Sequence, residues 1–279
     1  MLESELRSIL SSLSHLAASG DVPVQAFATL IRTARTEILA EHLHQRWLSN
    51  QNFGNVVAKI LSYSHNDERR DMKLCSQVLS LVLDDYRHRY GLQKDSRLTF
   101  RNYCRTLIEL LPVYLQIDRY MGHGLVKPLF DSLHMLIDEA NEDDDFQCIG
   151  QILVRSGTML SNLNPTETDR LAIKVRQAIT FYDRKLACYT RFVLLNAVDL
   201  WTYQWNSELM PMCLFNFYSE QYDRFHSNDY GEKRWLPVGM KCRRLLSDSS
   251  LAAGSSASSS FSQALSPEPL RSEEPESIV

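Results

Sequence analysis

Apolar residues recur every three or four positions along most of the chain. This spacing gathers them on one face of an α-helix, whereas a half-buried strand would alternate apolar and polar residues. We find no such alternation. The expected helices, about ten in number, cover residues 2–18, 24–48 with a break near Arg35, 53–63, 67–90, 98–117, 125–137, 143–162, 166–187, 191–205 and 209–225.

The residues between these runs suit helix ends. Ser96 can cap the helix that begins at Leu98, and Gly91 is expected to end the helix before it. Pro128 falls in the first turn of the run 125–137, where a missing N–H costs little. Asn164 precedes Pro165 and marks a break with a cap.

Short loops between consecutive helices favour antiparallel pairs. Five such pairs in a row predict an all-α fold, an α-solenoid of the HEAT type in which each pair contacts its neighbours. A compact helical bundle is the alternative. Glycine is scarce, at 10 of 279 residues, which also favours long helices over folds rich in tight turns.

The helical pattern stops at Ser247. Ten of the twenty residues from Ser247 to Ser266 are serine, and such a segment can bury too little apolar surface to offset the entropy of ordering it. We therefore expect one folded domain at 1–246 and a disordered, acidic, Ser-rich tail at 247–279.

The net charge and the cysteine content limit which binding partners and which compartment the sequence suggests. The net charge of −4 comes from the tail, while residues 1–246 balance at 29 acidic and 29 basic residues, so any contact with RNA would need a local patch. The six cysteines stand singly with no CxxC pair, which is typical of reduced thiols. With no signal peptide and no convincing membrane span, the sequence indicates a cytoplasmic protein that could also enter the nucleus.

Sequence motifs of catalysis are missing. The chain has no phosphate-binding glycine loop and no GxSxG elbow, so we expect no enzyme activity, cofactor or metal, although an all-α enzyme with an unrecognised site remains a third hypothesis. His42 and His44 are two residues apart and would face different sides of a helix. We interpret them as exposed helix histidines.

Two charged clusters are candidate partner-binding sites. Asp143, Asp144 and Asp145 either favour a helix N-terminus through the macrodipole or form an acidic docking patch for a basic partner. An exposed patch adds little to stability, so reversing all three charges is expected to leave the fold intact. The second cluster is basic and consists of Lys233, Arg234, Lys241, Arg243 and Arg244. These residues could bind phosphates or direct the protein to the nucleus, or they could be the solvated end of a helix.

Two short motifs are less specific indicators of function than the charged clusters. Tyr189 to Leu195 fits the YxxxxLΦ pattern of proteins that bind the cap-binding factor 4E, but its position in an apolar helix predicts that Leu194 and Leu195 are core residues. The chain ends in Ser277, Ile278 and Val279, the form that PDZ domains capture by strand addition.

Several segments resemble the middle domain of eukaryotic initiation factor 4G, and especially its small single-domain relatives. The most specific is Leu125 to Leu133 (LVKPLFDSL), which is similar to a helix start of that family. An acidic cluster before a Cys-bearing helix follows at Glu142 to Cys148. The run Leu79 to Tyr90, a short basic link and the aromatic-rich run Arg97 to Ile117 match the same pattern upstream.

Downstream, Trp205 and Tyr218-Ser219-Glu220 resemble the closing segment of the small relatives, so the resemblance covers about residues 20–225. It implies a scaffold without enzyme activity that holds a DEAD-box helicase, translation initiation factors or an mRNA-binding protein. The residues after Phe225 have no counterpart in that pattern, and the tail lacks a ligand motif for poly(A)-binding protein. The second hypothesis is a HEAT-like scaffold of another pathway, tethered to a PDZ protein through Val279.

Overall fold

The computed structural model describes residues 3–19, 33–66, 72–181 and 186–227. All of them belong to the first of two units into which the chain divides, Met1–Lys241. The candidate residues Lys233, Arg234, Lys241, Arg243, Arg244, Ser277, Ile278 and Val279 lie outside the described residues, as does the tail. The expected boundary at residue 246 stays a prediction.

The described part of the chain contains eleven α-helices and no strand, which confirms the all-α prediction. The helices are α1 Glu3–Ser19, α3 Thr36–Ser49, α4 Phe53–Asn66, α5 Met72–Arg87, α6 Arg89–Asp95, α7 Arg97–Ile117, α8 Arg119–Asp138, α9 Asp143–Leu163, α10 Pro165–Phe181, α11 Cys188–Thr202 and α12 Met212–Ser227.

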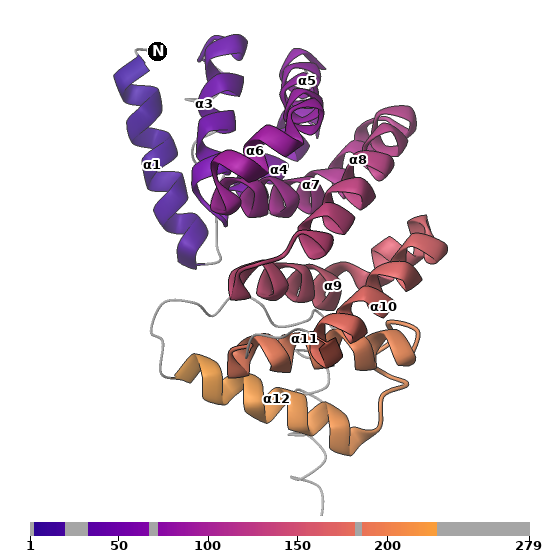
Figure 1. Ribbon diagram of the computed structural model, residues 1–279. Coiled ribbons are helices and arrows are strands. Elements are labelled where there is room, and N and C mark those ends of the chain that lie inside the picture. Colours follow the sequence, from indigo (N-terminus) through magenta and orange to yellow (C-terminus); the bar gives the residue numbers. More distant parts are fainter. Residues whose placement is uncertain (1–2, 20–32, 67–71, 182–185, 228–279) are drawn as a thin grey trace, which may run out of the picture. The chain divides into compact units, whose positions relative to one another are not determined.

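Helices pack mainly against helices near them in the sequence. α1 packs on α3 and α4, α7 packs on α4 and α8, and α9 packs on α10 and α11 (Figure 1). A compact bundle would instead bring the first and last helices around one shared core. The observed order is that of a solenoid-like stack, as predicted.

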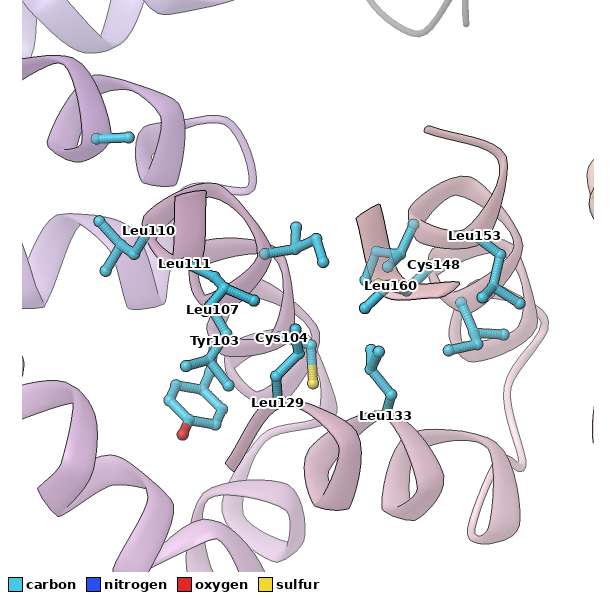
Figure 2. Packing of buried hydrophobic residues seen from close by; sticks show 14 of the residues in the cluster. Tyr103, Cys104, Leu107, Leu110, Leu111, Leu129, Leu133, Cys148, Leu153 and Leu160 are labelled. Atoms are coloured by element: carbon cyan, nitrogen blue, oxygen red, sulfur yellow. The ribbon is translucent and has the colours of Figure 1, made fainter. Parts of the chain in front are cut away.

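The long helix α7 lies at the centre of the core. Its side chains meet those of α8 and α9, and Figure 2 shows Leu107 and Leu111 of α7 with Leu129 and Leu133 of α8. The predicted apolar stripe of α8 is confirmed, because Leu125, Leu129 and Leu133 are completely buried and Leu136 is nearly so.

The predicted start of α8 is wrong. The helix begins at Arg119, capped by Asp118, which accepts the N–H of Met121 at 2.9 Å, so Pro128 lies mid-helix. Gly122 lies within the helix at a point of close packing on Leu115, where an added Cβ would lie 2.6 Å from a Leu115 methyl carbon. The missing N–H of Pro128 leaves the carbonyl of Gly124 without its helical partner, at a position open to solvent.

Two other predicted ends are confirmed, and one is wrong. Ser96 caps α7 by accepting the N–H of Thr99 at 3.2 Å, and Arg35 precedes the first residue of α3. α5, however, ends at Arg87, and Gly91 lies within the short helix α6. The guanidinium of Arg89 donates to the carbonyl of Tyr86 at 2.9 Å and so satisfies one of the open carbonyls at the end of α5.

Candidate protein-binding corner

A shallow, open hollow of about 640 Å³ lies where α6 meets α7 and where the α8–α9 loop passes them. We call it the α6–α9 corner. Charged and polar side chains form most of its wall, which consists of Gln93, Lys94, Asp95, Ser96, Arg97, Leu98, Arg101, Asn141 and Glu142. Enclosed apolar pockets are typical of small-molecule sites, whereas an open polar hollow suits side chains of another protein.

Asp145 is the centre of the charge network beneath the corner. It is only 1% exposed, and its carboxylate lies 2.7 Å from Nη1 of Arg97 and 2.9 Å from Nη1 of Arg101. It also accepts the backbone N–H groups of Asn141 and Glu142, at 3.3 and 3.2 Å. A buried carboxylate with this many donors is fully paired.

Arg101 connects the buried carboxylate to the rim. Its guanidinium lies 2.7 Å from the carboxylate of Glu142 and 3.4 Å from that of Asp144. Burial by itself would lower the pKa of Arg101, but the hydrogen bonds to Glu142 and Asp145 leave that pKa raised above its ordinary value. Arg101 therefore stays charged and fixes the start of α9 against α7.

Asp143, the first of the three aspartates, contacts a different helix, α11. The carboxylate of Asp143 accepts the backbone N–H of Ala187 at 2.7 Å and the hydroxyl of Thr190. Ala187 is the residue before α11 begins and itself offers no side-chain cap. Asp143 thus supplies from α9 the cap that the first turn of α11 lacks.

These contacts support the first of the two interpretations of the acidic cluster, and the docking interpretation stays a prediction. All three aspartates lie in the first turn of α9, so the helix N-terminus interpretation is confirmed. The expectation that all three could be reversed without harm to the fold is wrong, because Asp145 is buried and Asp143 caps α11. Spacing along the sequence could not show this, because Arg97, Arg101 and Thr190, which contact these aspartates, lie far from them in the chain.

The rim of the corner is exposed. Of the residues that line the hollow, Glu142 and Leu98 are each 51% exposed. Asp144 does not line it but lies beside it, 3.4 Å from Arg101, and is 69% exposed. Lys94 and Asp95 are exposed beside them. A partner would therefore meet both signs of charge and one apolar side chain, and of the predicted acidic site it would meet Asp144 rather than Asp145.

Several lining residues were not predicted as site residues. Arg97 and Arg101 are four residues apart and share one face of α7, which is a signal that the sequence contains. Leu98 is an apolar residue at the first turn of a helix, and Gln93 and Lys94 lie on α6, whose separation from α5 the sequence did not reveal.

The YxxxxLΦ pattern from Tyr189 to Leu195 lies on α11. Leu194 is buried, as expected, but Leu195 is 46% exposed, so its prediction as a core residue is wrong. On α11, the side chain of Leu194 faces the core and that of Leu195 faces solvent. With Leu194 inside, the YxxxxLΦ pattern that starts at Tyr189 does not form one surface.

His42 and His44 do face different directions, but the interpretation as exposed histidines is wrong. His42 is 12% exposed and lies 3.5 Å from Glu3 of α1, while His44 lies 2.9 Å from Asp85 of α5. Each therefore contacts a neighbouring helix. The Asp85 side chain is 7% exposed, so its contact with His44 is mostly shielded from water.

None of the described cysteines, Cys75, Cys104, Cys148, Cys188 and Cys213, is joined to another in a disulfide. Among the described residues, no group of three or more His, Cys, Asp or Glu side chains is arranged to hold a metal ion. No helix in this part of the chain is both long enough and apolar enough to cross a bilayer.

Comparison of the sequence with models of known protein families, and with characterised proteins, finds no match. The resemblance of residues 20–225 to the middle domain of initiation factor 4G therefore remains a prediction made from sequence pattern.

Proposed function

We propose that the protein is a non-enzymatic adaptor in the regulation of mRNA translation, and that its helix pairs are of the HEAT type. In this proposal it binds a translation initiation factor, a DEAD-box helicase or an mRNA-binding protein. The observation that carries the proposal is the α6–α9 corner, an open polar hollow with an exposed apolar residue at its edge. The sequence resemblance supports the choice of pathway.

The corner has the features of a protein-binding surface rather than of a catalytic pocket. Its two arginines are held by buried or half-buried partners, so the wall is rigid and little side-chain entropy is lost on binding. Its exposed charges of both signs favour a defined orientation and faster encounter with a partner of complementary charge. Such charges contribute less to affinity at high salt.

The test uses a variant that alters only the exposed rim. Leu98→Asp combined with Asp144→Lys changes two side chains that are 51% and 69% exposed and keeps the buried Asp145. We expect the variant to melt within a few degrees of the parent, because a lysine in the first turn of a helix costs about 1 kcal/mol at most. It should lose capture of initiation factors or a DEAD-box helicase, identified by mass spectrometry after affinity purification.

Glu41→Lys, at an exposed position of α3 that is not among the residues of the corner, is the matched control and should capture the same proteins as the parent. If the rim variant and the control capture initiation factors equally well, the corner is not the binding surface. If the parent captures PDZ scaffolds and no translation factor, the pathway assigned here is wrong and the C-terminal Ser277 to Val279 motif gains support.

A further inference from the structure

The side chain of Gln93, in the wall of the α6–α9 corner, carries an unpaired hydrogen-bond donor. Gln93 lies on α6 and is only 5% exposed, and its Nε2 has no hydrogen-bond partner among the described residues. Native proteins pair nearly all of their buried polar groups, because an unpaired group loses its contacts with water and gains none in return. Since Gln93 lines a hollow, a bound partner can supply the missing acceptor.

The guanidinium groups in the same wall already have acceptors. Both terminal nitrogens of Arg97 donate, one to Asp145 and the other to a backbone carbonyl of the α8–α9 loop, at 2.7 and 2.8 Å. Both terminal nitrogens of Arg101 donate to carboxylates at the start of α9. An incoming acceptor would have to displace one of these contacts, whereas the Nε2 group of Gln93 has none to lose.

The charges around the hollow favour an uncharged acceptor. Three basic and four acidic side chains lie in its wall or next to it, namely Lys94, Arg97, Arg101, Asp95, Glu142, Asp144 and Asp145. A carboxylate or a phosphate would gain no net attraction from this set. A backbone carbonyl carries no net charge, and every residue of a partner protein has one.

We propose that the corner binds a main-chain carbonyl in an extended segment of the partner protein, with Nε2 of Gln93 as the donor. This inference rests on the adaptor function proposed above and adds the chemistry that its partner presents. Leu98, 51% exposed at the edge of the same hollow, provides an apolar contact for a neighbouring side chain of the segment. An extended segment suits both contacts, because its carbonyls and its side chains point in different directions.

The amide group of Gln93 can reach the hollow without a change in the backbone. The last torsion of a glutamine side chain is broad rather than confined to three staggered positions. Rotation about that bond therefore carries Nε2 from its shielded position toward the open side of the wall. A water molecule at that place would have to be immobilised, whereas a carbonyl is held there by the rest of the bound segment.

The test follows the side-chain N–H signals of Gln93 by NMR in the isotope-labelled full chain. The probe is the uncharged tripeptide N-acetyl-Ala-Leu-Ala-amide, and sodium acetate and inorganic phosphate at equal ionic strength are the comparison ligands. We expect the tripeptide to shift these signals downfield in a saturable way, and acetate and phosphate to leave them in place. No shift with the tripeptide would overturn the proposal. An equal shift with acetate or phosphate would also overturn it and assign the hollow to an anionic partner.

A substitution at Gln93 tests the donor itself. Gln93→Met should bind the tripeptide about three- to tenfold more weakly, the loss expected for one hydrogen bond, as read from the backbone signals of Lys94 and Leu98. It should melt no lower than the parent, because it removes a polar group that has no partner in the free protein. Gln177→Met, at an exposed position of α10 outside the corner, is the matched control and should bind as the parent does. Equal binding by Gln93→Met and the parent would overturn the proposal, and if this variant does not fold, the signals of the parent decide.

This test is separate from that of the proposed function. It uses purified protein and no lysate, so its result does not depend on which proteins the chain captures. If Gln93 does not respond to the tripeptide while the rim variant still loses initiation factors, the adaptor function stands and the role of Gln93 is wrong. If Gln93 responds and no translation factor is captured, the peptide site stands and the assigned pathway is wrong.

Discussion

Arg101 and Asp145 form an ion pair in which both residues are almost fully buried, at 5% and 1% exposure, with 2.9 Å between Nη1 and Oδ1. One residue lies in the first half of α7 and the other in the first turn of α9, so the pair joins two neighbouring layers of the stack. Removing one member of such a pair leaves an uncompensated buried charge, which costs more than the pair itself contributes.

We therefore expect Asp145→Ala to lower the free energy of unfolding by about 3–5 kcal/mol, the range for breaking a buried pair. Asp144→Ala removes the neighbouring acid, which is 69% exposed, and should change stability by less than about 1 kcal/mol. Urea denaturation of both variants measures the difference. Equal losses would mean that Asp145 is hydrated in solution.

Leu133 provides a test of the core. It is completely buried on α8, in the cluster that α7 and α9 complete (Figure 2). Leu133→Ala should cost about 2–5 kcal/mol because it removes apolar contacts and leaves a cavity. Leu98→Ala, at a position that is 51% exposed, should stay within about 0.5 kcal/mol. A Leu133 variant that melts with the parent would show that this face of α8 is solvated.

Helix periodicity was enough to predict the fold class and the buried face of α8. It could not show that α8 starts six residues earlier, because Gly122 looks like a helix end in sequence and is instead a point of close packing on Leu115. The α6–α9 corner was only partly predictable for a similar reason. The aspartate triplet indicated a helix start, but which acid is buried depends on where α7 places Arg97 and Arg101.

Gly157 and Trp205 make a second close contact, between α9 and the turn after α11. An added Cβ at Gly157 would lie 2.0 Å from Cε3 of Trp205. Trp205 is only 7% exposed, and its carbonyl accepts a hydrogen bond from the hydroxyl of Thr158 on α9 at 2.9 Å. The ring therefore has little freedom to move away from a new side chain.

We expect Gly157→Ala to lower stability by about 1–3 kcal/mol through overpacking, although alanine is the better helix former. Gly91→Ala, in α6, adds a Cβ with nothing within 4 Å and should raise stability by about 0.5–1 kcal/mol. Thermal unfolding of the two variants measures whether each substitution lowers or raises stability. If Gly157→Ala were as stabilising as Gly91→Ala, Trp205 would not pack against α9 in solution.

His134 makes stability depend on pH at the contact between α8 and α10. Its Nε2 lies 2.8 Å from the carboxylate of Glu167, and its side chain is 17% exposed. Burial and the charge of Lys174 lower the pKa of His134 below 6.5, against the opposing effects of Glu167 and Asp138. The unfolded state therefore binds more protons than the folded state at mildly acidic pH, so the free energy of unfolding falls as pH falls below about 6.5.

The measurement compares urea denaturation at about pH 7.5 and about pH 5.5, the range in which histidine titrates. The parent should lose stability on acidification, and His134→Gln should lose less, because the variant has no group at this position whose pKa differs between the two states. His123→Gln, at an exposed position of the same helix, should keep the parent's pH dependence. If His134→Gln and the parent lose the same amount, His134 does not contribute to the acid sensitivity, because the neighbouring Glu167, Asp138 and Lys174 are present in both proteins.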